Sequence, residues 1–162
     1  MHTLQRTGKE ITAIYDRHVD TVYRICFSFM KNTADTEDMV QETFLRLISN
    51  GKKFKSTEHE KAWLIVTASN LCKDALKKWW RMNENIDDFA DALQEQPFRI
   101  DSTLEAILAL PDEYKTTVYM YYYEGYSTKE IASAMRCPAA TVRSRLARAR
   151  QLLKSKLGGD FR

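Results

Sequence analysis

The chain has 162 residues, 44% hydrophobic and 29% charged, with a formal net charge of +3. This length and composition predict a folded protein with one core of ordinary size or two small ones. No run of apolar residues approaches the roughly 20 that a membrane span needs, and the first ten residues lack the apolar core of a secretion signal. We therefore expect a cytoplasmic protein without membrane insertion.

The cysteine pattern argues against disulfide bonds and against a structural metal site. Cys26, Cys72 and Cys137 are an odd number of widely separated residues, which predicts no disulfide framework. The closely spaced cysteine and histidine ligands of a structural metal site are missing, so neither a metal nor a cofactor is expected. Since no Cys-His or paired-carboxylate constellation is present either, the sequence does not predict an enzyme.

Three helices are expected in the first half of the chain. Apolar residues recur every three or four positions between residues 9 and 30, as on one face of an amphipathic helix. A second helix is expected to begin at Asp35, as N-cap, and to end near residue 49, with Gly51 as a left-handed cap. After a polar loop at 51–60, a third helical pattern runs from Trp63 to Leu76.

An acidic segment follows. Between residues 83 and 101 six acids face a single arginine, Pro97 is present and periodicity is weak, which predicts a linker with one helical turn at about 89–93. The residues from Ser127 onward are instead dominated by lysine and arginine. This asymmetry favours a polyanionic partner for the basic end of the chain.

The last third of the chain predicts a helix-turn-helix. Short helices are expected from Ser102 and from Pro111, and Gly125 interrupts the second. Ser127 and Glu130 have the spacing of a capping box that starts a further helix. Pro138 is expected in the first turn of the final helix, where its missing N–H is not needed. A short helix, a turn and a longer helix form the helix-turn-helix arrangement.

The final helix has two contrasting faces. A narrow apolar stripe is expected to face the core, and small residues flanked by arginines are expected on the opposite side. Small side chains let a helix approach the floor of a major groove while arginines reach phosphates or guanine. A membrane-surface helix would instead present bulky apolar residues. The alternative is a basic face that is merely solvated. The stripe comprises Val142, Leu146, Ala149 and Leu153, and the small-residue face comprises Ala140, Ser144 and Ala147 between Arg143 and Arg148.

Two stretches resemble RNA polymerase sigma factors of the extracytoplasmic function (ECF) group of the sigma-70 family. "DTEDMVQETFLRL" is similar to their region 2.2, and "YYYEGYSTKEIASAMRCPAATVRSRLARARQLLK" is similar to their region 4. The likeness extends from about residue 11 to 157. It implies an all-α protein with two small helical domains, region 2 at 1–82 and region 4 at 102–162, joined by the acidic linker at 83–101. The implied function is a non-enzymatic initiation factor that gives core RNA polymerase its promoter specificity and helps to melt promoter DNA.

The resemblance also implies partners and contact residues. Region 2 would dock on the β′ clamp helices and capture unpaired bases of the −10 promoter element, and region 4 would bind the β flap and read the −35 element. Relatives are commonly held inactive by an anti-sigma protein. The matching positions are Asp35, Asp38, Gln41 and Glu42 for polymerase; Asn70, Lys73, Lys77, Lys78, Arg81 and Phe54 for the −10 element; and Ala140, Thr141, Arg143, Ser144, Ala147 and Arg148 for the −35 element.

Some positions leave alternatives open. The helix dipole is enough to explain the first-turn acids from Asp35 to Asp38, but it explains Gln41 and Glu42 poorly. Asn70 could simply be a polar residue on a helix surface, and Phe54 could flank a flipped base or anchor its loop. Trp79 and Trp80 stand where relatives are usually basic and could stack on bases or pack on the first helix; packing is expected for one of them.

Three further alternatives concern other parts of the chain. Ser69 stands where many relatives carry arginine, so the resemblance does not fix the −10 sequence. Tyr119, Tyr122 and Tyr123 are expected to serve the core and the flap contact rather than DNA. The acidic linker could occupy the polymerase channel that RNA later fills, or act as a solvated tether. A stand-alone helix-turn-helix repressor or activator is the other candidate function, but it leaves the first domain unexplained.

Overall fold

The computed structural model describes residues 6–82 and 100–157, and the regular structure in these ranges is entirely helical. The chain divides into two compact units, with the boundary between Phe98 and Arg99. The expected helical turn at 89–93 and most of the expected linker lie outside the described residues. Within the described ranges, no helix has both the length and the hydrophobicity to cross a membrane.

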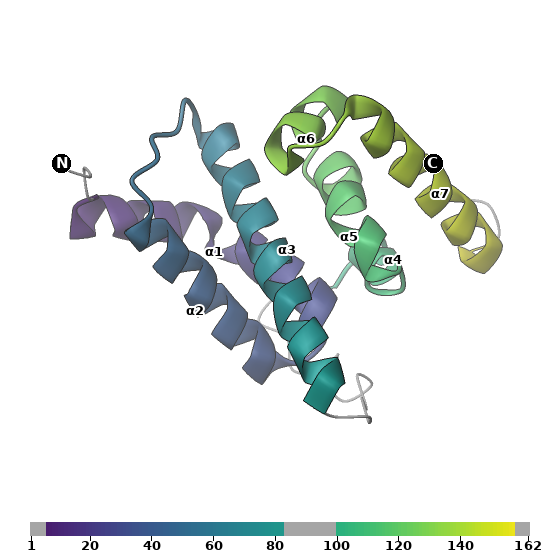
Figure 1. Cartoon of the computed structure of the whole chain (residues 1–162), viewed down its shortest axis with the longest axis horizontal. Helices are drawn as coiled ribbons and strands as arrows, with labels where there is room; N and C mark the ends of the chain where they lie inside the picture. Colours follow the sequence, from purple (N-terminus) through teal and green to yellow (C-terminus); the bar gives the residue numbers. More distant parts are fainter. Residues whose placement is uncertain (1–5, 83–99, 158–162) are drawn as a thin grey trace. The chain divides into compact units, whose positions relative to one another are not determined.

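In its described residues 6–82 the first unit is a bundle of three helices, which Figure 1 shows packed together. They are α1 (Gly8–Met30), α2 (Thr33–Ser49) and α3 (Thr57–Met82), and each packs on the other two. The predicted apolar faces meet at the centre, where Phe27, Leu47 and Leu64 are fully buried. The expectation of three helices in this half of the chain is therefore confirmed, and burial of these faces is the main stabilising contribution.

Both predicted caps of α2 are wrong, although the helix ends at Ser49 as expected. The N-cap is Asn32, whose side chain accepts a hydrogen bond from the Asp35 amide at 2.8 Å and donates one to the Asp35 carboxylate at 2.8 Å. At the other end Asn50 is extended (φ −98°), and Gly51 is not in the left-handed region. A left-handed glycine is not needed there because the Arg6 side chain donates to the Leu47 and Asn50 carbonyls.

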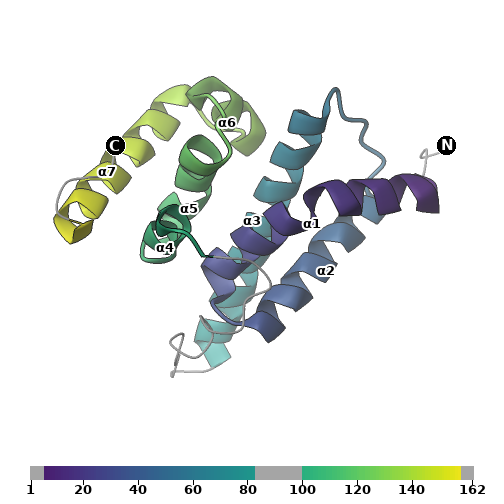
Figure 2. The ribbon, with the colours of Figure 1, turned by 180° about the vertical axis from the view of Figure 1, so that it is seen from behind.

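In the described residues 100–157, the second unit consists of five consecutive helical elements. Figure 2 shows the ribbon from behind. The elements are α4 (Ser102–Leu108), α5 (Asp112–Val118), the π-turn η2 (Tyr119–Tyr123), α6 (Thr128–Met135) and α7 (Ala139–Leu157). Leu104, Ile107 and Ile131 are fully buried in its core. Gly125 follows η2 with φ +80°, a conformation that favours glycine, and it interrupts the helix as predicted.

The π-turn was not predicted from the sequence. In η2 the Glu124 amide bonds to the Tyr119 carbonyl at 3.1 Å, five residues back, and the Tyr126 amide bonds to Met120 at 2.9 Å. The Tyr119 ring is buried, stacks on Tyr123 at 4.9 Å between centroids, and donates its hydroxyl to Glu124 at 2.7 Å. Tyr119 therefore belongs to the core, as expected, whereas Tyr122 and Tyr123 are half-buried.

Candidate nucleic-acid interface

The local geometry around α6 and α7 is a helix-turn-helix. The predicted capping box is present: the Glu130 amide donates to Ser127 Oγ at 3.1 Å and the Ser127 amide donates to Glu130 Oε1 at 2.8 Å. Arg136 ends α6 in a left-handed conformation (φ 55°) and turns the chain into α7. Pro138 stands immediately before α7 instead of inside its first turn, and from this cap position its carbonyl accepts from the Thr141 amide at 3.0 Å.

The two predicted faces of α7 are confirmed. Val142, Leu146, Ala149 and Leu153 have exposed fractions of 0–1% and face the core of the unit. On the opposite side the small residues and their flanking arginines are exposed: Ala140, Ser144, Ala147, Arg143 and Arg148. Thr141 is half-buried at the edge. The helix therefore offers solvent a surface with short side chains along its centre and two guanidinium groups beside it, which suits contact with nucleic acid.

The other two arginines of α7 lie closer to the protein. Arg145 and Arg150 are half-buried. Burial raises the pKa of the Tyr122 hydroxyl, and the nearby Arg150 cation opposes that rise. Arg145 and Arg150 therefore lie off the exposed centre of the face, and Arg150 is within electrostatic reach of Tyr122 in η2.

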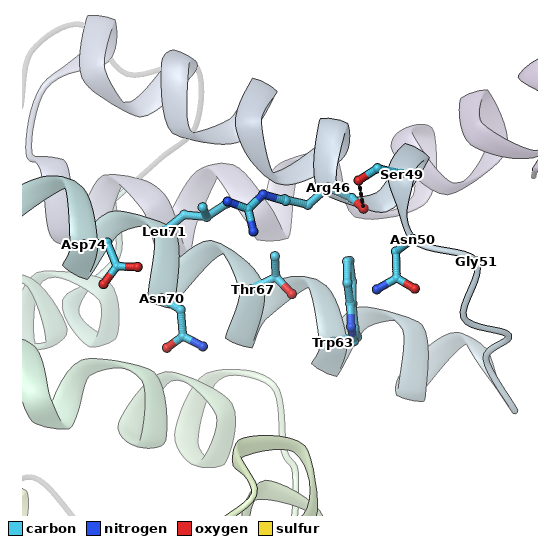
Figure 3. Close-up of a pocket in the computed structure, with 9 residues that line it drawn as sticks. All are labelled: Arg46, Ser49, Asn50, Gly51, Trp63, Thr67, Asn70, Leu71 and Asp74. Carbon is cyan, nitrogen blue, oxygen red and sulfur yellow. Dashed lines mark hydrogen bonds between the residues drawn. The ribbon is translucent and has the colours of Figure 1, made fainter. Parts of the chain in front are cut away.

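A groove of about 570 Å³ runs along α3 in the first unit, and we call it the Asn70 groove. Figure 3 shows Trp63, Thr67 and Asn70 along α3, with the Arg46 side chain reaching across from α2. Asn70 is exposed, so both its amide donors and its acceptor are accessible. The remaining lining residues are Ser49, Asn50, Gly51, Leu71 and Asp74.

Most of these groove residues were missed in the sequence. Asn70 was matched through the resemblance alone, whereas Arg46 and Asn50 come from α2 and its C-cap, and they meet α3 only because the helices pack. The available signal was the spacing of Trp63, Thr67 and Asn70, which are four and three residues apart and share one helix face.

The remaining −10 candidates are not gathered in one place. Lys73 is half-buried and Lys77 is exposed on α3, while Lys78 borders a separate hollow beside α2. The Arg81 side chain lies outside the described part. Phe54 is half-buried and packs on Trp63, with ring centroids 5.7 Å apart, so it anchors its loop in this structure.

The α3 residues that differ from the pattern of the resembled family have local explanations. Ser69 is buried and donates its hydroxyl to the Ile65 carbonyl at 2.8 Å, one turn back. An arginine there would need a different packing of the bundle. Trp79 is 38% exposed and borders the hollow with Met30, Asp38 and Lys78. It is therefore partly packed, and the side chain of Trp80 lies outside the described residues.

On α2 the polymerase candidates separate into two kinds. Asp35 is half-buried and is hydrogen-bonded to the Asn32 cap, so it has a structural role at the helix start. Asp38, Gln41 and Glu42 are exposed. The same helix face continues into two exposed apolar residues that the sequence analysis missed, Leu45 (49%) and Ile48 (45%). We call this surface the α2 stripe: Asp38, Gln41, Glu42, Leu45 and Ile48.

A buried polar cluster connects α1 to the start of α3. His18 Nε2 lies 2.7 Å from Glu60 Oε1, and the Arg17 guanidinium lies 3.0 Å from the same oxygen. Burial lowers the pKa of His18, with smaller contributions in the same direction from the Arg17 and Lys61 cations, and Glu60 opposes the shift. His18 is therefore neutral near pH 7 and donates a hydrogen bond to the carboxylate.

Comparison with known proteins gives both units a family. Residues 14–82 match the family described as Sigma-70 region 2, and residues 100–153 match Sigma-70, region 4. The ECF RNA polymerase sigma factor SigM of Bacillus subtilis is 31% identical over 155 residues, which cover 90% of this chain and 93% of SigM. The ECF sigma factor SigE of Mycolicibacterium smegmatis is also 31% identical, over 87% of this chain and 59% of SigE.

Solved structures share the fold. The sigma factor RpoE of Bartonella quintana, solved in complex with the anti-sigma factor NepR, matches with a TM-score of 0.74 at 20% identity and covers 94% of this chain and 99% of that chain. CnrH, solved with the cytosolic domain of CnrY, matches with a TM-score of 0.65 over 96% and 92% of the two chains. Taken with the two family matches, these results show that the chain belongs to the ECF sigma factors of the sigma-70 family, non-enzymatic initiation factors that bind core RNA polymerase and direct it to promoter DNA.

Proposed function

We propose that the exposed face of α7 reads the −35 promoter element in the major groove. The observation that carries this proposal is the contrast between the buried stripe and the exposed small residues on the same helix. The short side chains of Ala140, Ser144 and Ala147 allow close approach to the bases, and Arg143 and Arg148 reach guanine acceptors or phosphates at the edges. Thr141 contributes at the rim.

In the first unit, we propose that the Asn70 groove receives an unpaired base of the −10 element. The Asn70 amide can pair with a base edge, and the Trp63 ring supplies a flat apolar surface for stacking. Lys73 and Lys77 of α3 then follow the phosphates, together with Lys78 and Arg81 farther along the helix. Phe54 takes part indirectly, by packing on Trp63.

The α2 stripe is our proposal for the surface that docks on the β′ clamp helices of polymerase. Asp38, Gln41 and Glu42 provide a polar, anionic end, and Leu45 and Ile48 provide exposed apolar area. Interfaces commonly combine an apolar centre with a charged rim that selects the partner. Asp35 supports this surface from the helix start.

The two compact units support an organisation in two domains. We propose region 2 at 1–82, a linker at 83–101 and region 4 at 102–162, with the half-buried Tyr122 and Tyr123 facing the β flap. An anti-sigma protein is the proposed inhibitory partner, as NepR and CnrY are found with the structural neighbours. The proposed compartment is the cytoplasm, where RNA polymerase acts.

The test is run-off transcription with purified core polymerase on a library of promoter fragments. The full chain is expected to enrich templates that share two short elements at a fixed spacing. Initiation no more selective than that of core polymerase alone would contradict the proposal. A second measurement separates it from a stand-alone repressor: specific duplex binding by the isolated chain is expected to be weak, since the −10 bases are read unpaired.

A further inference from the structure

Arg6 contacts the end of α2 and the loop that follows it, more than 40 residues away in sequence. It precedes α1, yet its guanidinium donates hydrogen bonds to the carbonyls of Leu47 (3.3 Å), Asn50 and Lys52. The same group lies 5.0 Å from the centroid of the Phe54 ring. One side chain therefore satisfies carbonyls at the end of α2, holds the following loop and stacks on its aromatic residue.

The segment that Arg6 holds forms one end of the Asn70 groove. Asn50 and Gly51 line the groove directly, and Phe54 packs on Trp63, which also lines it. Between α2 and α3 the loop at 51–56 has no regular structure and depends on side-chain contacts. Besides Arg6 and the packing of Phe54 on Trp63, these contacts include the Lys52 amide on Asn50 Oδ1 (2.7 Å), the Lys55 amide on His59 Nδ1 (3.1 Å) and the His59 amide on Ser56 Oγ (3.1 Å), and the edge of one ring of the Phe54–His59 pair meets the face of the other.

We propose that Arg6 is a positioning residue for promoter opening: it fixes the loop that shapes the Asn70 groove before DNA arrives. This inference rests on the proposed function of that groove as the site for an unpaired −10 base. A loop ordered in advance lowers the entropy cost of binding. Arginine is suited to the task because its planar fork can serve several carbonyls and an aromatic ring at once, which a lysine ammonium cannot do.

Hydrogen exchange of the full-length chain tests the structural part. The variants are Arg6→Ala and Arg6→Lys, with Lys9→Ala as the matched control because Lys9 is an exposed cation on the first turn of α1. In Arg6→Ala the loop amides at 50–56 are expected to exchange about tenfold faster, with the buried amides of the three helices unchanged. Arg6→Lys should restore only part of the protection. Unchanged loop exchange in Arg6→Ala would overturn the proposal.

Promoter opening by the holoenzyme tests the functional part. Arg6→Ala is expected to slow opening about tenfold on an intact promoter while binding to core polymerase is unchanged. On templates made abasic at single −10 positions, the defect should disappear at the captured base, because there is then no base for the loop to position. Equal slowing on every template would make Arg6 a general stabiliser and overturn the inference.

A wrong assignment of the Asn70 groove and a wrong role for Arg6 would give different results. If the wild-type chain opens promoters but no abasic position affects opening, the assignment of the Asn70 groove is wrong, while the exchange experiment still judges whether Arg6 orders the loop. If removing one −10 base does change the rate of opening, and Arg6→Ala does not alter the size of that change, the groove assignment stands and the role of Arg6 is refuted.

Discussion

Two alanines on opposite faces of α7 allow recognition to be separated from stability. Ala147 is exposed at the centre of the proposed reading face, whereas Ala149 is 1% exposed and packs in the core. Replacing Ala147 by leucine places a bulky side chain where the helix meets the groove floor. The expected loss is that of about one base contact, ~1–3 kcal/mol or roughly 5- to 150-fold in −35-dependent binding.

Replacing Ala149 by leucine should instead lower the stability of the second unit. Inserting extra methylenes into a packed core costs about 1–3 kcal/mol, and each kcal/mol lowers the Tm of a unit of this size by roughly 4–8 °C. Ala147→Leu should leave the free energy of unfolding within about 0.5 kcal/mol of wild type, because leucine is a good helix former and the site is exposed.

Circular dichroism on the full chain measures the stability of both variants, and holoenzyme transcription measures promoter use. Templates with an intact −35 element are compared with templates in which that element is scrambled. Ala147→Leu is expected to reduce only the advantage of the intact element. The reasoning is refuted if this variant unfolds the second unit, or if it folds normally and still uses the −35 element as wild type does.

Further expectations concern the other surfaces. Arg148→Ala should weaken −35-dependent transcription by about 1–3 kcal/mol if the contact is bidentate; an equal loss on all −35 sequences would indicate a phosphate contact instead. Asn70→Ala should abolish promoter opening, measured by permanganate reactivity, and leave core binding intact; normal opening would remove Asn70 from the site. Glu42→Lys should weaken binding to core polymerase in a salt-dependent way, measured by fluorescence anisotropy, without changing the unfolding curve; unaltered affinity would place docking elsewhere. Burial lowers the pKa of His18 from its ordinary value of 6.5, so as the pH falls this side chain takes up a proton in the unfolded chain before it does so in the folded chain. The contribution of His18 to the free energy of unfolding should therefore be complete above pH 6.5 and be lost as the pH drops below it. Denaturant unfolding at about pH 7.5 and about pH 5.5 checks this, and His18→Gln should flatten the difference.

The features that could be predicted are those determined by neighbours in sequence. The capping box was predictable because Ser127 and Glu130, three residues apart, satisfy each other's amides whatever the rest of the chain does. The two faces of α7 were predictable for a similar reason, since helical periodicity alone separates Leu146 from Ala147. Both features are present in the folded chain as the sequence predicts, because each depends on residues that are close together in sequence.

The features that could not be predicted depend on packing between distant segments. The Asn70 groove needs Arg46 from α2 and Trp63 from α3, which meet only after the bundle forms. Arg6 reaches carbonyls more than 40 positions away, so nothing near it in sequence indicates its role. The prediction of the first residue of α2 was wrong for a different reason. Asn32 and Asp35 are both good N-caps, and only the structure shows which of them the helix uses.

The π-turn of η2 has a consequence for how region 4 tolerates change in length. A π-turn contains one residue more than an α-turn, and each helical residue rotates the chain by about 100°. Removing a single residue from Tyr121–Tyr123 would therefore leave an ordinary α-turn, with little change in the rotation between α5 and the segment that follows. Buried Tyr119 and Met120 would keep their places in the core. A one-codon gap here is consequently milder than one inside α5, where losing one residue turns the two sides of the helix by about 100° against each other.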